Sequence, residues 1–348
     1  MIIVMKPEAT EEEINHLVER VTEAGLRAHV SRGAEQCVVG AIGDETKLQS
    51  VPFLAIPGVE SAVPITKPYK LASRGMNPEG TRIKIRDFVI GGDEIVVAGG
   101  PCSVEPNTSL IETARAIKAA GAKILRGGAF KPRTSPYDFA GMAEDGLKLL
   151  DEARNETGLA IVTEVMDTRD VDLVYRYADA FQIGARNAQN FNLLREVGKY
   201  DKPVFLKRGL AMTVKEWLMS AEYVMSQGNR DVVMVERGIR TFETSTRNTL
   251  DLCGVSVAQA ETHLPIFVDP SHAAGDFRYV IGLSRAAIAC GVDGLLVEVH
   301  PNPEKAMSDG AQTLKFSKFE RLMQEIRPIA QAVGRRVPAG AEAALATR

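Results

Sequence analysis

The sequence predicts an α/β protein in which a (β/α)8 TIM barrel follows a small ferredoxin-like domain. From residue 94 onwards, eight short apolar runs alternate with helical segments over about 240 residues, which is the size of a closed parallel barrel. Residues 1–65 show the element order βαββαβ, a common small regulatory architecture. An open doubly wound sheet is the alternative, but it would need fewer strands and usually a GxGxxG turn, which this sequence lacks.

The ferredoxin-like domain is predicted over residues 1–65. Its helix is expected to start at Thr10, because this good N-cap residue is followed by three glutamates, and acids in the first turn favour the helix dipole. Apolar residues then recur at helical spacing until Gly25 ends the helix. The other predicted elements are strands at 2–5, 27–31, 36–42 and 60–65 and a weaker helix at 45–53.

Residues 66–93 are predicted to connect the two domains, because they are rich in Pro, Gly and Lys and contain the pattern of a small hairpin. The barrel is predicted over residues 94–337. Its eight strands are expected at 95–99, 124–127, 160–165, 180–183, 203–207, 232–236, 265–268 and 294–299. The Ala-rich tail, 338–348, has no apolar periodicity and is predicted to be disordered.

The composition is that of an ordinary globular protein, with 45% hydrophobic and 25% charged residues. The net charge of −3 gives no reason to expect nucleic acid or a membrane as a partner. The four cysteines are far apart and form no CxxC pair, which is typical of reduced thiols in a cytoplasmic protein. No signal peptide is recognisable, and no stretch approaches the roughly 20 apolar residues of a membrane span.

Cationic side chains follow several of the predicted barrel strands, and the loops after the strands are where a (β/α)8 barrel carries its chemistry. A single cation of this kind is more often a solvated surface group. Six cationic side chains at one mouth of the barrel would repel one another unless anions neutralise them. Arg and Lys suit phosphate and carboxylate groups. The set therefore indicates two anionic substrates, at least one of them phosphorylated. Its members are Arg126, Lys131, Arg133, Arg186, Lys207 and Arg237.

A second set combines a thiol, an imidazole and two carboxylates, all of which are metal-ligand types. These residues follow the first, seventh and eighth predicted strands, which are neighbours in a closed barrel. The mixed S, N and O donors suit a divalent ion such as Mn, Fe, Co or Zn. Taken singly, Cys102 also fits a core position, His272 an acid–base role and Asp309 a turn cap. The set consists of Cys102, His272, Glu298 and Asp309.

Five short motifs occur in order along the barrel: Gly-Pro-Cys-Ser at 100–103, Lys-Pro-Arg-Thr-Ser at 131–135, Gly-Ala-Arg at 184–186, Asp-Pro-Ser-His at 269–272 and Glu-Val-His at 298–300. Together they resemble the 3-deoxy-D-arabino-heptulosonate 7-phosphate (DAHP) synthases, over residues 94–335. The whole chain resembles the subgroup with a ferredoxin-like regulatory domain. The resemblance implies a metal-dependent, aldol-like condensation of phosphoenolpyruvate with erythrose 4-phosphate, the first step of the shikimate pathway of aromatic amino acid biosynthesis.

The resemblance also implies a role for each site residue. The metal would be held by Cys102, His272, Glu298 and Asp309. Phosphoenolpyruvate would be held by Arg126, Lys131, Arg186, Lys207 and Arg237. Erythrose 4-phosphate would be held by Arg133, Thr134 and Ser135. Catalysis is assigned to Cys102 and His272 at the metal and to Lys131, which we expect to donate a proton to the aldehyde oxygen.

Two other functions compete with this interpretation. The 3-deoxy-manno-octulosonate 8-phosphate synthases share the barrel and phosphoenolpyruvate, but their loop after the second strand typically reads Lys-Ala-Asn-Arg-Ser, and they are not expected to carry the N-terminal domain. A non-catalytic metabolite sensor, in which the small domain binds a ligand and the barrel is a scaffold, would leave both the cationic set and the ligand set without a purpose.

Residues 1–65 have no catalytic set, so regulation is the role we expect of them. The hypothesis is that an aromatic amino acid, tyrosine or phenylalanine, binds there and inhibits the barrel. His29 and Ser31, next to Gly33, are predicted to line an effector pocket between two such domains. The alternative is that the small domain only aids oligomerisation or solubility. A homotetramer is the assembly that the family resemblance implies.

Overall fold

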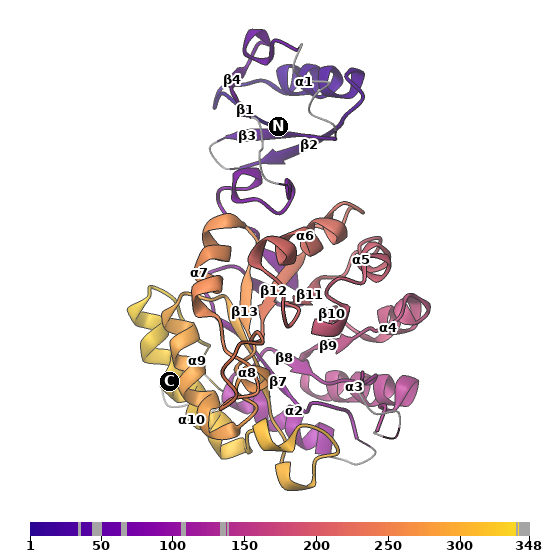
Figure 1. Cartoon of the computed structure of the whole chain (residues 1–348), viewed down its shortest axis with the longest axis vertical. Coiled ribbons are helices and arrows are strands. Elements are labelled where there is room, and N and C mark those ends of the chain that lie inside the picture. Colours follow the sequence, from indigo (N-terminus) through magenta and orange to yellow (C-terminus); the bar gives the residue numbers. More distant parts are fainter. Residues whose placement is uncertain are drawn as a thin grey trace. The chain divides into compact units, whose positions relative to one another are not determined.

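The computed structural model describes residues 1–33, 36–43, 51–63, 68–105, 109–132, 137, 139–338 and 340. The chain divides into two compact units (Figure 1). The smaller unit comprises Met1–Thr81 together with the short segment Ala260–His263, and the larger unit comprises the rest. The segment from 68 to 81 thus groups with the small unit, and the hairpin that follows it groups with the barrel.

The smaller unit is a four-stranded antiparallel sheet with the strand order β2-β3-β1-β4 and one described α-helix. Its elements are β1 (Ile2–Met5), α1 (Glu11–Glu23), β2 (Arg27–Arg32), β3 (Cys37–Ile42) and β4 (Val59–Val63). The predicted helix at 45–53 and the end of the predicted strand at 60–65 lie largely outside the described residues. The sheet order and the elements around α1 confirm the ferredoxin-like class.

Helix α1 starts where the sequence places its N-cap. The Thr10 Oγ1 accepts a hydrogen bond of 3.3 Å from the Glu13 amide, and the Glu13 carboxylate accepts one of 2.8 Å from the Thr10 amide. This reciprocal capping box satisfies two amide groups that would otherwise lack a partner at the helix start. The apolar stripe of the helix, including Leu17 and Val21, is then buried against Val39 on β3.

The larger unit is a closed barrel of eight parallel strands, in which β9 pairs with β10 to complete the ring. The predicted (β/α)8 fold is therefore confirmed. The strands are β7 (Val96–Gly100), β8 (Ile124–Arg126), β9 (Ala160–Glu164), β10 (Ala180–Ile183), β11 (Val204–Lys207), β12 (Val232–Glu236), β13 (Ile266–Val268) and β14 (Gly294–Glu298). Every residue of these strands is buried, because side chains fill the barrel on one side and helices cover it on the other.

Helices surround the strands, as Figure 1 shows for the larger unit. They are α2 (Ser109–Ala120), α3 (Ala143–Thr157), α4 (Val171–Tyr177), α5 (Phe191–Val197), α6 (Val214–Met225), α7 (Leu252–Glu261), α8 (Pro270–Ala274), α9 (Phe277–Ala289) and α10 (Phe316–Ala332). Helix α8 is a short extra helix that follows β13 directly and precedes α9. None of the described helices is long and apolar enough to cross a membrane.

A two-stranded hairpin, β5 (Ile83–Ile85) and β6 (Phe88–Ile90), belongs to the core of the barrel. Its apolar side chains cluster with Val96, Ile124 and Ala160, the first residues of β7, β8 and β9. The hairpin therefore covers the amino ends of these strands. The carboxyl ends form the other mouth of the barrel, where the loops after the strands meet.

Candidate active site

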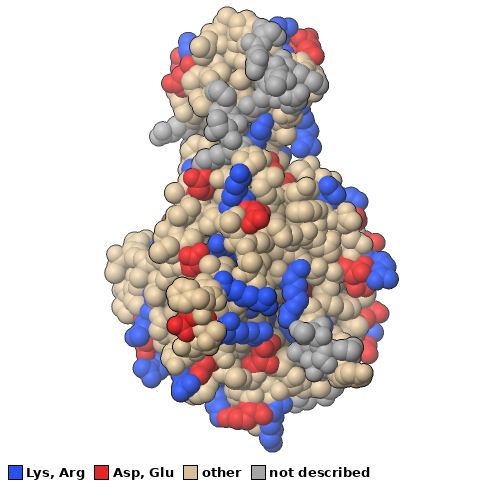
Figure 2. All heavy atoms as spheres, viewed as in Figure 1, with Lys and Arg blue, Asp and Glu red and all other residues tan. Residues whose placement is uncertain are grey.

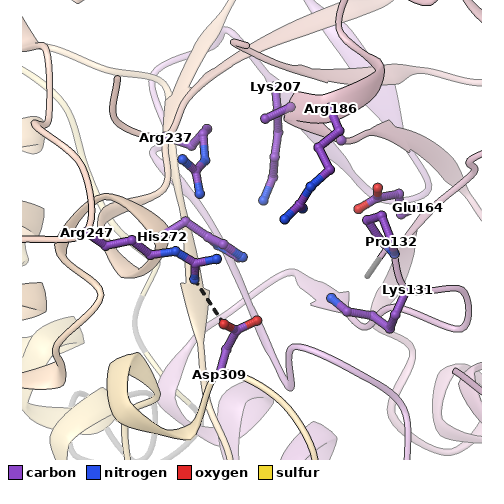
Figure 3. Close-up of a pocket in the computed structure, with 11 residues that line it drawn as sticks. Lys131, Pro132, Glu164, Arg186, Lys207, Arg237, Arg247, His272 and Asp309 are labelled. Atoms are coloured by element: carbon purple, nitrogen blue, oxygen red, sulfur yellow. Dashed lines mark hydrogen bonds and ion pairs between the residues drawn. The ribbon is translucent and has the colours of Figure 1, made fainter. Parts of the chain in front are cut away.

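A cavity of about 200 Å³ lies at the carboxyl ends of the barrel strands. Four members of the predicted cationic set point into it, each from the end of a different strand or the loop after it: Lys131, Arg186, Lys207 and Arg237 (Figure 3). Lys and Arg side chains also gather around a hollow in the middle of the barrel face in the space-filling view (Figure 2). The remaining lining is Pro132, Glu164, Gly184, Ala185, Arg247, His272 and Asp309.

Of the other two members of the cationic set, only Arg126 belongs to the described residues. Arg126 is buried, and its Nη1 donates to the Pro101 carbonyl at 2.7 Å and to Glu298 Oε1 at 3.1 Å. It therefore contacts the predicted metal ligands and does not line the open cavity. Arg133 lies outside the described residues, as do Thr134 and Ser135. The role predicted for these three residues stays a prediction from the sequence.

The four predicted metal ligands come together beside this cavity. One donor atom from each of Cys102, His272, Glu298 and Asp309 can be chosen so that all four lie within 4.8 Å of one another. The Cys102 Sγ lies 2.8 Å from Asp309 Oδ2, and His272 Nε2 lies 3.4 Å from Glu298 Oε1. One sulfur, one imidazole nitrogen and two carboxylates form a donor set that fits a divalent transition-metal ion.

The Asp-Pro-Ser-His motif has a local structural explanation. Asp269 directly follows β13 and caps α8, accepting a hydrogen bond of 2.9 Å from the His272 amide. Pro270 occupies a position in the first turn that needs no amide donor. The Ser271 hydroxyl accepts a 3.0 Å hydrogen bond from the Glu298 amide, which joins α8 to β14. The short helix thereby places His272 next to Glu298.

Asp269 fixes the orientation of two site residues at once. Its Oδ2 lies 2.7 Å from His272 Nδ1 and accepts a 2.7 Å hydrogen bond from Lys207 Nζ. Because Nδ1 is engaged, His272 presents Nε2 to the cluster, the carboxylate–histidine arrangement that supports metal-bound imidazoles. Asp269 is fully buried, and its charge offsets part of the positive charge of the cavity.

The Gly-Pro-Cys-Ser motif begins at a glycine that the packing requires. Gly100 has φ 143°, and it pairs with Glu298 of β14. A Cβ atom at this position would lie 2.0 Å from the Arg126 carbonyl oxygen of β8. Only glycine allows the three strands that carry Cys102, Arg126 and Glu298 to approach this closely.

Burial changes the electrostatics of the site. It lowers the pKa of Lys207 and of His272, although the Asp269 carboxylate opposes both changes. Burial, reinforced by the Glu298 carboxylate, raises the pKa of the Cys102 thiol to about 11, although Lys131 lies 3.0 Å from its sulfur. A buried group of cations gains stability from an anion, and a protonated thiol gives up its proton when a metal binds.

Four residues of the site do not belong to the sets predicted from the sequence. Asp269 and Glu164 stand at strand ends, so their position is a signal for them. Glu164 Oε2 accepts a 3.0 Å hydrogen bond from Gln182, and the carboxylate faces the cavity. Arg247 and Gln312 lie in the long loops after β12 and β14, and no sequence pattern identifies them. Figure 3 shows the ion pair of 2.9 Å between Arg247 and Asp309.

The predicted effector residues lie in the smaller unit, on strand β2 at the edge of its sheet. Ala28 and Val30 pack against the core under α1, so the alternating residues His29 and Ser31 belong to the opposite face of the sheet. Both side chains are partly exposed.

Nearly the whole chain is similar to known proteins of one family. Residues 72–332 match the model described as DAHP synthetase I family, and residues 1–67 match the DAHP synthase ferredoxin-like domain. A phospho-2-dehydro-3-deoxyheptonate aldolase of Thermotoga maritima is 50% identical over 337 residues, covering 97% of this chain and 100% of the relative. A 2-dehydro-3-deoxyphosphooctonate aldolase of Syntrophotalea carbinolica is 30% identical over 266 residues, covering 71% of this chain and 95% of the relative.

Two solved structures from Thermotoga maritima share the fold. The phospho-2-dehydro-3-deoxyheptonate aldolase superposes with a TM-score of 0.77 at 50% identity, covering 97% of this chain and 99% of the other. A truncated form of 3-deoxy-D-arabino-heptulosonate 7-phosphate synthase superposes with a TM-score of 0.73 at 49% identity, covering 78% of this chain and 99% of the other.

The close packing around Gly100 generates a stability prediction. Gly100→Ala would force a Cβ against the Arg126 carbonyl and an alanine into a left-handed conformation. We expect a loss of about 2–4 kcal/mol in the free energy of unfolding, measured by denaturant titration. Gly282→Ala in α9 is the matched control, because no atom lies within 4 Å of its Cβ position. Equal unfolding free energies for the two variants would contradict this steric explanation.

Proposed function

The chain belongs to the DAHP synthetase I family and is an enzyme of that family, and we propose that it condenses phosphoenolpyruvate, D-erythrose 4-phosphate and water in a metal-dependent reaction. The products are 3-deoxy-D-arabino-heptulosonate 7-phosphate and inorganic phosphate. The observation that carries the proposal is the cavity lined by five cations, Arg247 among them, next to a cluster of four metal-ligand side chains. Such a site suits two anions that react beside a divalent ion.

Phosphoenolpyruvate is the first anion that the cavity suits. It carries a carboxylate and a phosphate. Lys207 supplies an ammonium group from the end of β11, and Arg186 and Arg237 supply two guanidinium groups from just after β10 and β12. Fixing this molecule would place its C3 towards the metal-ligand cluster. The same cations would stabilise the negative charge that develops as the phosphate leaves with C–O cleavage.

Erythrose 4-phosphate is proposed as the second anion. Its aldehyde would lie at the metal-ligand cluster, and its phosphate would bind Arg133, Thr134 and Ser135. Lys131 and Pro132, which precede these residues in the chain, line the cavity. The C3 of phosphoenolpyruvate attacks the aldehyde carbon, and water adds at C2.

The metal-ligand residues and Lys131 supply the remaining chemistry. A divalent ion held by Cys102, His272, Glu298 and Asp309 would act as a Lewis acid or hold a water. Lys131 Nζ lies 3.0 Å from the Cys102 sulfur, so its ammonium group stands beside the place proposed for the aldehyde oxygen. We assign to it the donation of a proton to that oxygen as the new C–C bond forms.

The competing reaction uses arabinose 5-phosphate in place of the four-carbon sugar. The relative with that kind of name covers 71% of this chain, whereas the heptonate aldolase covers 97%. The loop sequence Lys-Pro-Arg-Thr-Ser also favours the four-carbon sugar. We therefore place the enzyme at the first step of the shikimate pathway in the cytoplasm, and we propose a homotetramer as its assembly.

The metal requirement leads to a direct test. Chelation should abolish turnover, and several divalent ions should restore it. Cys102→Ala should lose at least about 90% of the activity, because removing a ligand both weakens binding and alters geometry. The matched control is Cys253→Ala in α7, where the cysteine is exposed and outside the cluster. Full turnover in excess chelator would refute the metal requirement.

The preferred aldose is tested by comparing kcat/KM for erythrose 4-phosphate and arabinose 5-phosphate. We expect the shorter sugar to be favoured at least about tenfold, because the longer one must displace the phosphate anchor or buckle. Changing residues 132–134 from Pro-Arg-Thr to Ala-Asn-Arg should reduce this ratio. A wild-type preference for the longer sugar would overturn the assignment and leave the barrel chemistry standing.

We also propose that the smaller unit binds tyrosine or phenylalanine and inhibits the barrel. It is a compact unit of its own, and His29 and Ser31 offer polar groups on the sheet face away from α1. Binding of the amino acid and inhibition of the barrel then both depend on residues of the smaller unit, so removal of its sheet must abolish the inhibition.

A chain beginning at Pro68 tests this regulation. It should stay active, because it keeps the contacts that residues 68–81 make with the end of α7 and the residues just after it. Examples are the 2.7 Å hydrogen bond from Tyr69 to Glu261 and the 2.6 Å contact between Thr81 and His263. It should also lose inhibition by aromatic amino acids. In the full chain, His29→Ala with Ser31→Ala should weaken inhibition. Inhibition that survives the deletion would locate the effector site on the barrel.

A further inference from the structure

The two carboxylates among the four metal-ligand residues, Glu298 and Asp309, are both held by a short chain of polar side chains. The Arg247 Nη1 donates to Asp309 Oδ1 at 2.9 Å and to Gln312 Oε1 at 2.9 Å. The Gln312 Nε2 in turn donates to Glu298 Oε2 at 2.7 Å. Asp309 and Glu298 are thus joined through Arg247 and Gln312, although neither connecting residue belongs to the ligand set.

The direction of these hydrogen bonds is dictated by chemistry. A guanidinium group only donates, so the Gln312 atom that faces Arg247 must be the amide oxygen. A carboxylate only accepts, so the amide NH2 group must face Glu298. Gln312 is 2% exposed, and an unpaired amide at that depth is costly. A glutamine therefore fits this position in one orientation, which ties the loop after β14 to the end of that strand.

Each carboxylate divides its two oxygens between the cluster and this chain. Asp309 turns Oδ2 to Cys102 and Oδ1 to Arg247. Glu298 turns Oε1 to His272 and Oε2 to Gln312. With the outer oxygen held, rotation of the carboxylate is blocked, and the inner oxygen stays directed at the other donors.

The backbone of the loop supports the same arrangement. Asp309 has φ 52° and ψ 29°, a left-handed conformation that non-glycine residues seldom adopt. It stands just before the single turn η7 (Gly310–Gln312) and makes no capping hydrogen bond there; its carboxylate instead contacts Cys102 and Arg247. Gln312 ends the same turn, and Arg247 contacts both residues.

We propose that Arg247 and Gln312 are positioning residues that orient Asp309 and Glu298 for a divalent ion. The proposal rests on the proposed function, because it assumes that the four-residue cluster binds metal. Neither residue contacts the ion. They fix the orientation of the two carboxylates before the ion binds, which lowers the entropy cost of binding.

Metal binding to the metal-free enzyme tests the proposal without an activity assay. Cobalt(II) is titrated into the protein, and the cobalt–thiolate absorption of Cys102 reports both affinity and ligand geometry. We expect Arg247→Met and Gln312→Met to weaken cobalt binding about 10–100-fold and to alter the ligand-field bands. Arg247→Lys keeps one donor and should recover part of the affinity. Arg240→Met, an exposed arginine of the same loop, is the matched control and should bind as wild type does.

Unfolding of the metal-free proteins shows whether each variant is folded. If Gln312→Met does not fold, Gln312→Asn replaces it, since the shorter amide cannot span both partners. Unchanged cobalt affinity and spectra in the Arg247 and Gln312 variants would overturn the proposal while leaving the metal site intact. A wild-type protein without cobalt–thiolate absorption would instead refute the metal site itself, and with it the proposed function.

Discussion

Coulomb repulsion among the cations of the cavity is the constraint that the rest of the site satisfies. Lys131, Arg186, Lys207 and Arg237 surround a space of about 200 Å³. Two like charges about 4 Å apart repel by roughly 4 kcal/mol at an effective dielectric constant near 20. Buried Asp269 offsets part of this repulsion by pairing with Lys207. The positive charge that remains uncompensated is what suits the cavity to anionic molecules.

The backbone determines where these charged groups lie. Gly100 lets three strands meet without a side chain between them, and Asp269 starts the short helix α8 while also holding His272 and Lys207. The hairpin of β5 and β6 fills the opposite end of the barrel with apolar side chains. Rigid strands and a closed base thus hold the polar groups at one mouth, where solvent and ligands have access.

Most of the barrel could be predicted from the sequence, because a buried parallel strand is a continuous apolar run and a helix has its own period. All eight predicted strand positions overlap the observed strands, such as 232–236 and β12 (Val232–Glu236). The donor set from Cys102 to Asp309 could be predicted because strand ends converge in a closed barrel. Arg247 and Gln312 could not, since loops after β12 and β14 have no periodicity that fixes where a side chain points.

The pairing of β14 with β7 joins the last strand of the barrel to its first. Cys102 follows the first strand, whereas His272, Glu298 and Asp309 come from the last portion of the chain. The metal-ligand cluster therefore straddles the seam of the cylinder. During synthesis on the ribosome, a growing chain holds its thiol long before the other three donors emerge. The four donors therefore come together only when β14 pairs with β7 and the barrel closes.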